Sequence, residues 1–199
     1  MTEEEKALAR SDRYLAVVER LSLCPFARLC RESGKLERQV LPGSAGLLQA
    51  ALGAVQRIEA LPEESVEVGL LLFPGFASDL RAFEAFCLEV RAGCRDFFCV
   101  PFHPDLPEDL ADEHRAVGFI RRAPDPTLQL VRKSLLERVR GEQGSVFVDA
   151  SKLSHEQLMT LEPPTSLSDR IASDNLASVR KASADALRLE LDAIRRLGR

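Results

Sequence analysis

A strand, a helix and a second strand follow one another in the middle of this chain and constrain its fold most. Residues 66–73 form a β-branched, apolar run that ends at Pro74 and Gly75, and residues 97–102 form a second apolar run. Between them, apolar residues at spacings of three and four predict one buried helix face: Phe76, Leu80, Phe83, Cys87 and Val90. This order predicts a right-handed crossover and a parallel strand pair.

Further segments extend the same alternation of helices and strands. We expect helices at residues 4–21 and 47–61 and strands at residues 36–41 and 145–150. With 199 residues, 45% of them hydrophobic, the chain is long enough to bury a sizeable core. The sequence therefore predicts a single α/β domain over residues 1–199, a layered sandwich with a small, mostly parallel sheet of about four strands.

The charge and the ends of the chain limit the partners that we expect. A formal net charge of −4 and a pI of about 5.5 give no global attraction to nucleic acid or anionic lipid. The first five residues are acidic where a secretory signal would be basic, and no apolar run approaches the roughly 20 residues that span a bilayer. We expect a cytoplasmic protein with neither a membrane nor a nucleic-acid partner.

The five cysteines predict free thiols and not a disulfide framework. Their number is odd, no two of them have CxxC spacing, and a cytoplasmic chain of this size needs no covalent staples. They are Cys24, Cys30, Cys87, Cys94 and Cys99.

The segment around Asp125 and Pro126 is typical of a helix start. An aspartate caps free amide groups, and proline loses nothing at the first helical position. We therefore expect a loop over residues 104–124 and then a helix whose buried side chains are Leu128, Val131, Leu135 and Val139.

Two arginines stand immediately before this predicted helix. Arg121 and Arg122 would flank the positive end of the helix dipole, and the Thr127 hydroxyl would lie in the first turn. Such an arrangement favours phosphate or carboxylate. The alternative is a solvated helix face with surface arginines.

His103 follows the apolar run 97–102, at the strand end where α/β sheets present side chains to ligands. With Asp105 two residues further on, it can serve as a general acid or base, because its unperturbed pKa is about 6.5. The alternative is a partly buried imidazole that is hydrogen-bonded to a loop carbonyl, with Pro104 and Asp105 only shaping the turn.

Cys24 lies at the break after the first helix, directly before Pro25. A thiol near His103 or an arginine would have a lowered pKa and could be a nucleophile, a redox group or a metal ligand. The alternative is burial in the packing of that helix. No ligand spacing supports a metal site of Cys24, His103 and Asp105, so the sequence assigns no metal.

The C-terminal third has two predicted parts. Residues 151–168 contain two adjacent prolines and are expected to cross the surface as a linker or lid. Residues 169–197 form one long amphipathic helix that packs on the domain or, as a homodimer, on a second copy of it. Asn175 either caps the apolar part of this helix or reaches into a cleft.

Several motifs together resemble those of a known family. They are LCPFA at residues 23–27, FHPD at 102–105, PDPTLQLVR at 124–132, and a late Asn175 before a helix that ends at residues 196–198. With them the chain resembles a bacterial family known as the domain of unknown function 1415. The resemblance implies that motif positions are occupied by Cys24, His103, Asp105, Arg122, Thr127, Arg132 and Asn175. It implies neither a reaction nor a cofactor.

Three classes of function remain open. The first is a small enzyme that holds an anionic molecule and uses His103 with Asp105 as acid or base and Cys24 beside them; its anion-binding residues would be Arg121, Arg122, Thr127, Arg132 and Asn175. A metal-dependent enzyme with Cys and His ligands is a variant of it. The second is a non-catalytic module for an anionic metabolite or nucleotide, and the third an oligomerising protein. The enzyme hypothesis requires that these remote segments line one pocket.

Overall fold

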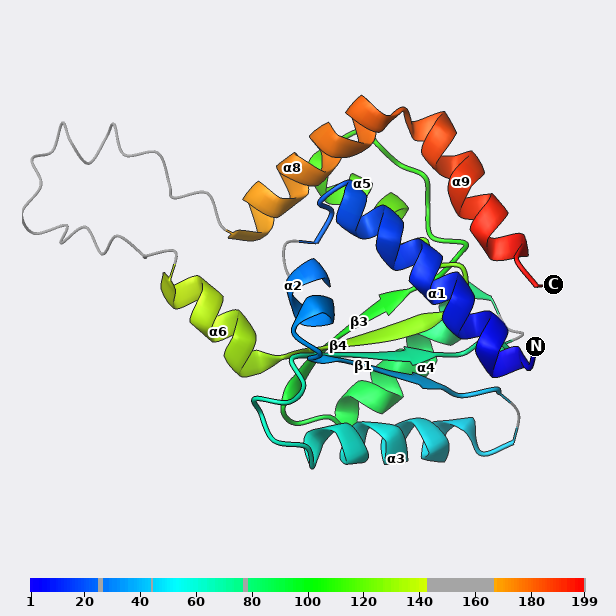
Figure 1. Ribbon diagram of the computed structural model, residues 1–199, viewed down its shortest axis with the longest axis vertical. Coiled ribbons are helices and arrows are strands. Elements are labelled where there is room, and N and C mark those ends of the chain that lie inside the picture. The colour runs from blue at the N-terminus through cyan, green and yellow to red at the C-terminus, as the bar shows by residue number, and fades with distance from the viewer. Residues whose placement is uncertain (25–26, 44, 77–78, 143–166, 199) are drawn as a thin grey trace, which may run out of the picture.

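The computed structural model describes residues 1–24, 27–43, 45–76, 79–142 and 167–198 (Figure 1). In chain order the elements are α1 (Glu3–Arg20), α2 (Ala27–Glu32), β1 (Leu36–Val40), α3 (Leu47–Glu59), β2 (Val68–Leu72), α4 (Leu80–Ala92), β3 (Phe97–Phe102), α5 (Glu113–Ile120), β4 (Thr127–Arg132), α6 (Lys133–Glu142), α8 (Leu167–Ala182) and α9 (Ala184–Arg196). No helix in this described part of the chain is both long and apolar enough to cross a membrane.

The four strands form one sheet in the order β1-β2-β4-β3. The β1 and β2 strands pair in parallel, whereas β4 is antiparallel to both of its neighbours, β2 and β3. The α/β class is confirmed. The expected mostly parallel sheet is wrong, because β4 enters the sheet between two strands that run in the opposite direction.

Residues 127–132 form this central strand, although the sequence predicts a helix there. Leu128 and Leu130 alternate with period two and are fully buried on one face of the sheet. Both edges of the strand are hydrogen-bonded, which satisfies its backbone without a helix. The predicted direct pairing of residues 66–73 with residues 97–102 is therefore wrong, and a helix begins only at Lys133.

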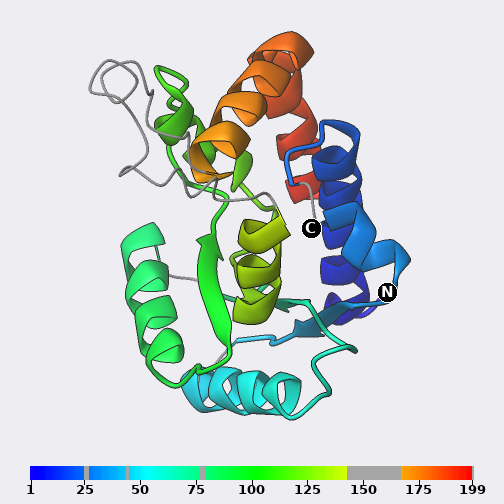
Figure 2. The ribbon, with the colours of Figure 1, turned by 90° about the vertical axis from the view of Figure 1, so that its left-hand side faces the viewer.

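The α3 and α4 helices cover one face of the sheet, as Figures 1 and 2 show. Both helices were predicted, α3 from the turn residues that bound it and α4 from its apolar periodicity, and each buries one face. The core here joins Val55 and Ile58 of α3 and Phe83 of α4 to Leu71 of β2 and Leu128 of β4. The strand side chains that do not pack on α3 and α4 lie on the opposite face of the sheet.

The α1 helix lies across the opposite face of the sheet. Its Leu15 packs with Leu70 and Leu72 of β2. Beyond the end of the sheet, α1, α5, α8 and α9 share a second core; its buried members include Tyr14, Val18, Phe119, Val179, Leu187, Leu191 and Ile194. The molecule therefore has three layers, with a cluster of helices above one end of the sheet.

Two segments differ from their predictions. Residues 169–197 form two helices, α8 and α9, because the backbone turns at Ser183, whose φ is +66°. Residues 104–124 also contain a helix, α5, which Asp112 caps through the amide of Arg115. The apolar stripe of α9 is buried within the chain, while a homodimer through this helix stays a prediction.

Two predicted segments fall outside the described residues. They are the strand at residues 145–150 and most of the linker or lid at residues 151–168, of which the last two residues begin α8.

A buried ion pair joins three distant parts of the fold. Arg10 of α1 is 1% exposed, and its Nε donates to Asp125 at 2.7 Å, just before β4. Its other guanidinium nitrogens donate to the carbonyl of Leu197 at 3.1 Å and to Glu3 at 3.1 Å. Arg10 therefore holds α1 to the start of β4 and to the end of α9.

Arg10→Met should lower the free energy of unfolding by about 3–5 kcal/mol, because the fully buried Asp125 carboxylate loses its guanidinium partner. Urea denaturation measures this loss. The matched control is Arg38→Met, which breaks the ion pair with Asp12, a side chain that is 60% exposed. That variant should lose about 1 kcal/mol or less. Equal losses in the two variants would contradict the role assigned to Arg10.

Candidate functional site

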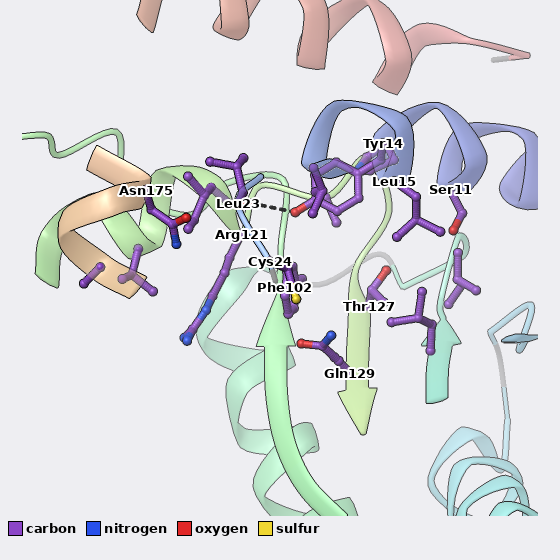
Figure 3. A pocket seen from close by; sticks show the side chains of 18 residues that line it. Ser11, Tyr14, Leu15, Leu23, Cys24, Phe102, Arg121, Thr127, Gln129 and Asn175 are labelled. Atoms are coloured by element: carbon purple, nitrogen blue, oxygen red, sulfur yellow. Dashed lines mark hydrogen bonds between the residues drawn. The ribbon is translucent and has the colours of Figure 1, made fainter. Parts of the chain in front are cut away.

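A cavity of about 330 Å³ lies between α1 and the sheet, near the helix cluster (Figure 3). We call it the pocket. Its lining comes from α1 and the segment after it, from β2, β3 and β4, from the end of α5 and from α8: Ser11, Tyr14, Leu15, Val18, Leu23, Cys24, Leu70, Leu72, Phe102, Val117, Ile120, Arg121, Ala123, Pro124, Thr127, Gln129, Ala172 and Asn175. Segments that are far apart in the sequence therefore meet at one place.

The alternation of β4 gives the pocket its floor. Leu128 and Leu130 point into the core below the sheet, so Thr127 and Gln129 point the other way, toward α1. Leu70 and Leu72 of β2 lie on the same face. The floor and walls are thus mostly apolar, with a few polar groups among them.

Arg121 is the one charged side chain among the described residues that line the pocket. It follows the last turn of α5, and its carbonyl accepts a hydrogen bond from the amide of His103 at 3.1 Å. No hydrogen bond or ion pair joins its guanidinium to any other residue of the described chain. Arg121 is half-buried, and this partial burial lowers the pKa of its guanidinium.

Two carboxamides share the pocket with this guanidinium. Asn175 of α8 is only 4% exposed, and Gln129 lies in the middle of β4 (Figure 3). Within the described chain neither carboxamide has a hydrogen-bond partner. Asn175 lies inside α8 and not at its start, so its predicted capping role is wrong and its alternative, a place in a cleft, is what the structure has.

Two of the three hydroxyl groups that line the pocket are already hydrogen-bonded within the protein; the third belongs to Ser11. Tyr14 donates to the carbonyl of Ile120 at 2.6 Å, and Thr127 donates to the carbonyl of Asp125 at 2.8 Å. Burial raises the pKa of Tyr14, so its phenol stays protonated near neutral pH and acts as a fixed donor. The hydroxyls of Tyr14 and Thr127 shape the pocket, and the guanidinium, the two carboxamides and the Ser11 hydroxyl are its available polar groups.

Half of the residues predicted as a site come together here: Cys24, Arg121, Thr127 and Asn175. Cys24 is half-buried at the junction after α1. Sequence reasoning missed Tyr14 and Gln129. Gln129 is the one polar residue among the apolar residues 128–131, which could have indicated its role in a site. The helix prediction for this segment prevented that interpretation.

His103 and Asp105 do not line the pocket. The imidazole is 2% exposed, packs 5.5 Å from the ring of Phe83, and accepts a hydrogen bond at Nδ1 from the amide of Asp105 at 3.2 Å. The Asp105 side chain is 56% exposed and binds Arg195 at 3.0 Å. His103 is therefore a buried imidazole bonded within its loop, as its alternative stated, except that its partner is the amide of Asp105 and not a carbonyl.

Arg122 and Arg132 also point elsewhere. Arg122 donates to the carbonyl of Pro104 at 3.0 Å and pairs with Glu108. Arg132, at the far end of β4, donates to the carbonyl of Val66 at 2.8 Å and lies 4.5 Å from the centre of the Phe97 ring. The prediction that a helix start binds the anion is wrong, because a strand and not a helix begins at Thr127.

The described residues hold no group of three or more His, Cys, Asp and Glu side chains that could bind a metal. Cys24 and His103, which the metal-dependent hypothesis needs together, do not share the pocket. The chemistry that the pocket can offer rests on a guanidinium, two carboxamides, a serine hydroxyl and a thiol.

His103 should titrate below its usual range. Burial lowers its pKa, although the nearby Asp105 acts in the opposite direction, and protonation at Nδ1 would break the bond from the Asp105 amide. The unfolded chain then binds the proton more readily, so stability should fall as pH drops below about 6.5 toward the folded pKa. An NMR titration of the imidazole measures the pKa. A value above 6.5 would contradict this account, and His103→Gln should remove that part of the pH dependence of unfolding.

Comparison with known proteins gives a match to one protein family and to no individual protein. No curated protein matches it, and no solved structure does. One family, described as Protein of unknown function (DUF1415), matches residues 13–153, which include the pocket residues from Tyr14 to Gln129 but not those of α8. The resemblance drawn from the sequence motifs is thereby confirmed, and the chain belongs to the DUF1415 family.

Proposed function

We propose that this protein binds a small molecule that has a mostly apolar body and one acidic group, with Arg121 as the anchor of that group. The observation that carries the proposal is the guanidinium of Arg121, which lies in a mostly apolar pocket without an acidic partner among the described residues. An acidic ligand would supply that partner.

The energetics of a desolvated cation support this function. A charge that leaves water costs several kcal/mol unless an opposite charge and hydrogen bonds compensate for it. The fully buried Arg10 has two carboxylates beside it, and Arg122 pairs with Glu108. The buried Arg132 has no carboxylate, but it donates to the carbonyl of Val66 and lies over the ring of Phe97. The half-buried guanidinium of Arg121 has neither kind of partner among the described residues, and such groups are concentrated at functional sites.

The apolar lining supports the second half of the proposal. Leu15, Leu70, Leu72 and Phe102 line the pocket, and hydrocarbon buried against them contributes roughly 25 cal/mol per Å². A purely polar anion would leave this surface without a partner. The lining therefore favours an amphipathic molecule.

A catalytic version of this function would use Cys24. Of the three residues expected to be catalytic it is the one that lines the pocket, whereas His103 and Asp105 lie outside. The geometry therefore favours binding first, with thiol chemistry at Cys24 as the second candidate.

Arg121→Gln tests the anchor, because it removes the charge but keeps a planar hydrogen-bonding group. An apolar anionic dye, anilinonaphthalene sulfonate, should bind the unsubstituted protein and gain fluorescence. Its Kd should rise about 10-fold or more in the variant, which corresponds to the loss of one charged hydrogen bond. Arg122→Gln is the matched control and should leave the Kd unchanged, because Glu108 already neutralises Arg122. Equal Kd values in all three proteins would refute the proposal.

Alkylation of Cys24 gives an independent measure of occupancy. Saturating dye should slow the reaction of Cys24 with iodoacetamide in proportion to the occupied fraction, because the thiol lines the same pocket. Cys94, which is also partly exposed but lies against Glu59 on the other side of the sheet, should react at an unchanged rate. Peptide mass spectrometry resolves the two sites. Equal protection of both thiols would mean that the dye binds elsewhere.

A further inference from the structure

We infer that the acidic group of the ligand is a single carboxylate and not a phosphate. This inference rests on the proposed function and narrows the substrate class of the same pocket. Three features of the pocket carry it: its charge, the helix end that faces it, and its uncharged hydrogen-bonding groups.

The charge of the lining matches a monoanion. Arg121 contributes one positive charge, and no other described residue of the lining is a lysine, arginine, histidine or acid. A carboxylate neutralises that charge. A phosphate monoester carries about −1.5 to −2 at pH 7 and would leave an excess negative charge in an apolar enclosure. Charge balance therefore favours the carboxylate.

The backbone around the pocket points to the same choice. Phosphate sites are commonly built from the free amide groups at a helix start or in a glycine-rich loop. Here β4, and not a helix, begins at Thr127, and the helix end that reaches the pocket is the carboxyl end of α5, at Ile120 and Arg121. That end is the negative pole of the helix dipole, so it opposes any charge beyond the one that Arg121 neutralises.

The guanidinium and the carboxamides suit a carboxylate in their geometry. A guanidinium presents two parallel N–H groups that match the two oxygens of one carboxylate. Asn175, which is 4% exposed, and Gln129 can donate to the remaining lone pairs or accept from an uncharged polar group of the ligand. Both carboxamides lack hydrogen-bond partners among the described residues, so both are available to a ligand.

The size of the cavity restricts the rest of the molecule. A volume of about 330 Å³ is at the lower end of the range for small-molecule sites. Together with the apolar lining, this favours a short-chain or single-ring carboxylic acid. Such a ligand would place its carboxylate at Arg121 and its hydrocarbon against Leu70 and Leu72.

Three probes with alkyl tails of nearly the same length test this inference: octanoate, octanamide and octyl phosphate. Isothermal titration of the unsubstituted protein at pH 7 should give a Kd for octanoate that is about 10-fold or more below those of the other two. In Arg121→Gln, octanoate should lose this advantage, while octanamide should keep its Kd within about threefold. The comparison on the unsubstituted protein does not depend on any variant folding.

A second variant reverses the preference. Gln129→Lys adds a second positive charge to the lining and should tighten octyl phosphate more than octanoate; Gln129→Leu, without a new charge, should not. The unsubstituted protein decides the inference: octyl phosphate or octanamide binding as tightly as octanoate would overturn it and leave the proposed function standing. If none of the three probes and no dye bound, the proposed function itself would be overturned.

Discussion

The insertion of β4 between β2 and β3 is the constraint on which the rest of the structure depends. Hydrogen bonds on both of its edges hold the sheet together, and its side chains serve two different interiors. Leu128 and Leu130 complete the core under α3 and α4, while Thr127 and Gln129 form part of the pocket under α1. A shift of register by one residue would place leucines in the pocket and polar groups in the core. The stability of the sheet and the chemistry of the pocket are thus set by the same pairing.

Local periodicity predicts the elements of this fold better than their pairing. The helices α1, α3 and α4 and the strands β2 and β3 lie where their apolar patterns or bounding turn residues place them. The prediction failed at residues 125–132, because Asp125 and Pro126 resemble a helix start and Leu128 and Val131 share a helical spacing. In the structure Asp125 is instead the buried partner of Arg10. Pairing on both edges outweighs the local preference, and no short segment carries that information.

In the candidate site, a difference of one residue position decides whether a side chain faces the pocket. His103 was chosen because it follows a buried strand, and it does stand at the end of β3. Side chains alternate along a strand, so Phe102 faces the pocket whereas His103 faces Phe83 of α4. The sequence predicts that His103 lies at the end of the strand. The face of the sheet toward which its side chain points depends on where α1 and α4 pack, which the sequence pattern does not show. Cys24 and Asn175 reach the pocket through tertiary packing that no spacing in the chain reveals.

The two neighbouring arginines after α5 make the same point through charge. In sequence Arg121 and Arg122 are equivalent candidates for binding an anion. Arg122 turns toward Glu108, whose other oxygen accepts from Arg188 of α9, and so helps to fasten the helix cluster. Arg121 lines the pocket instead, and no described residue gives it a carboxylate. Of two adjacent arginines, one is thus neutralised within the fold, and the other is the one that the proposed acidic ligand would neutralise.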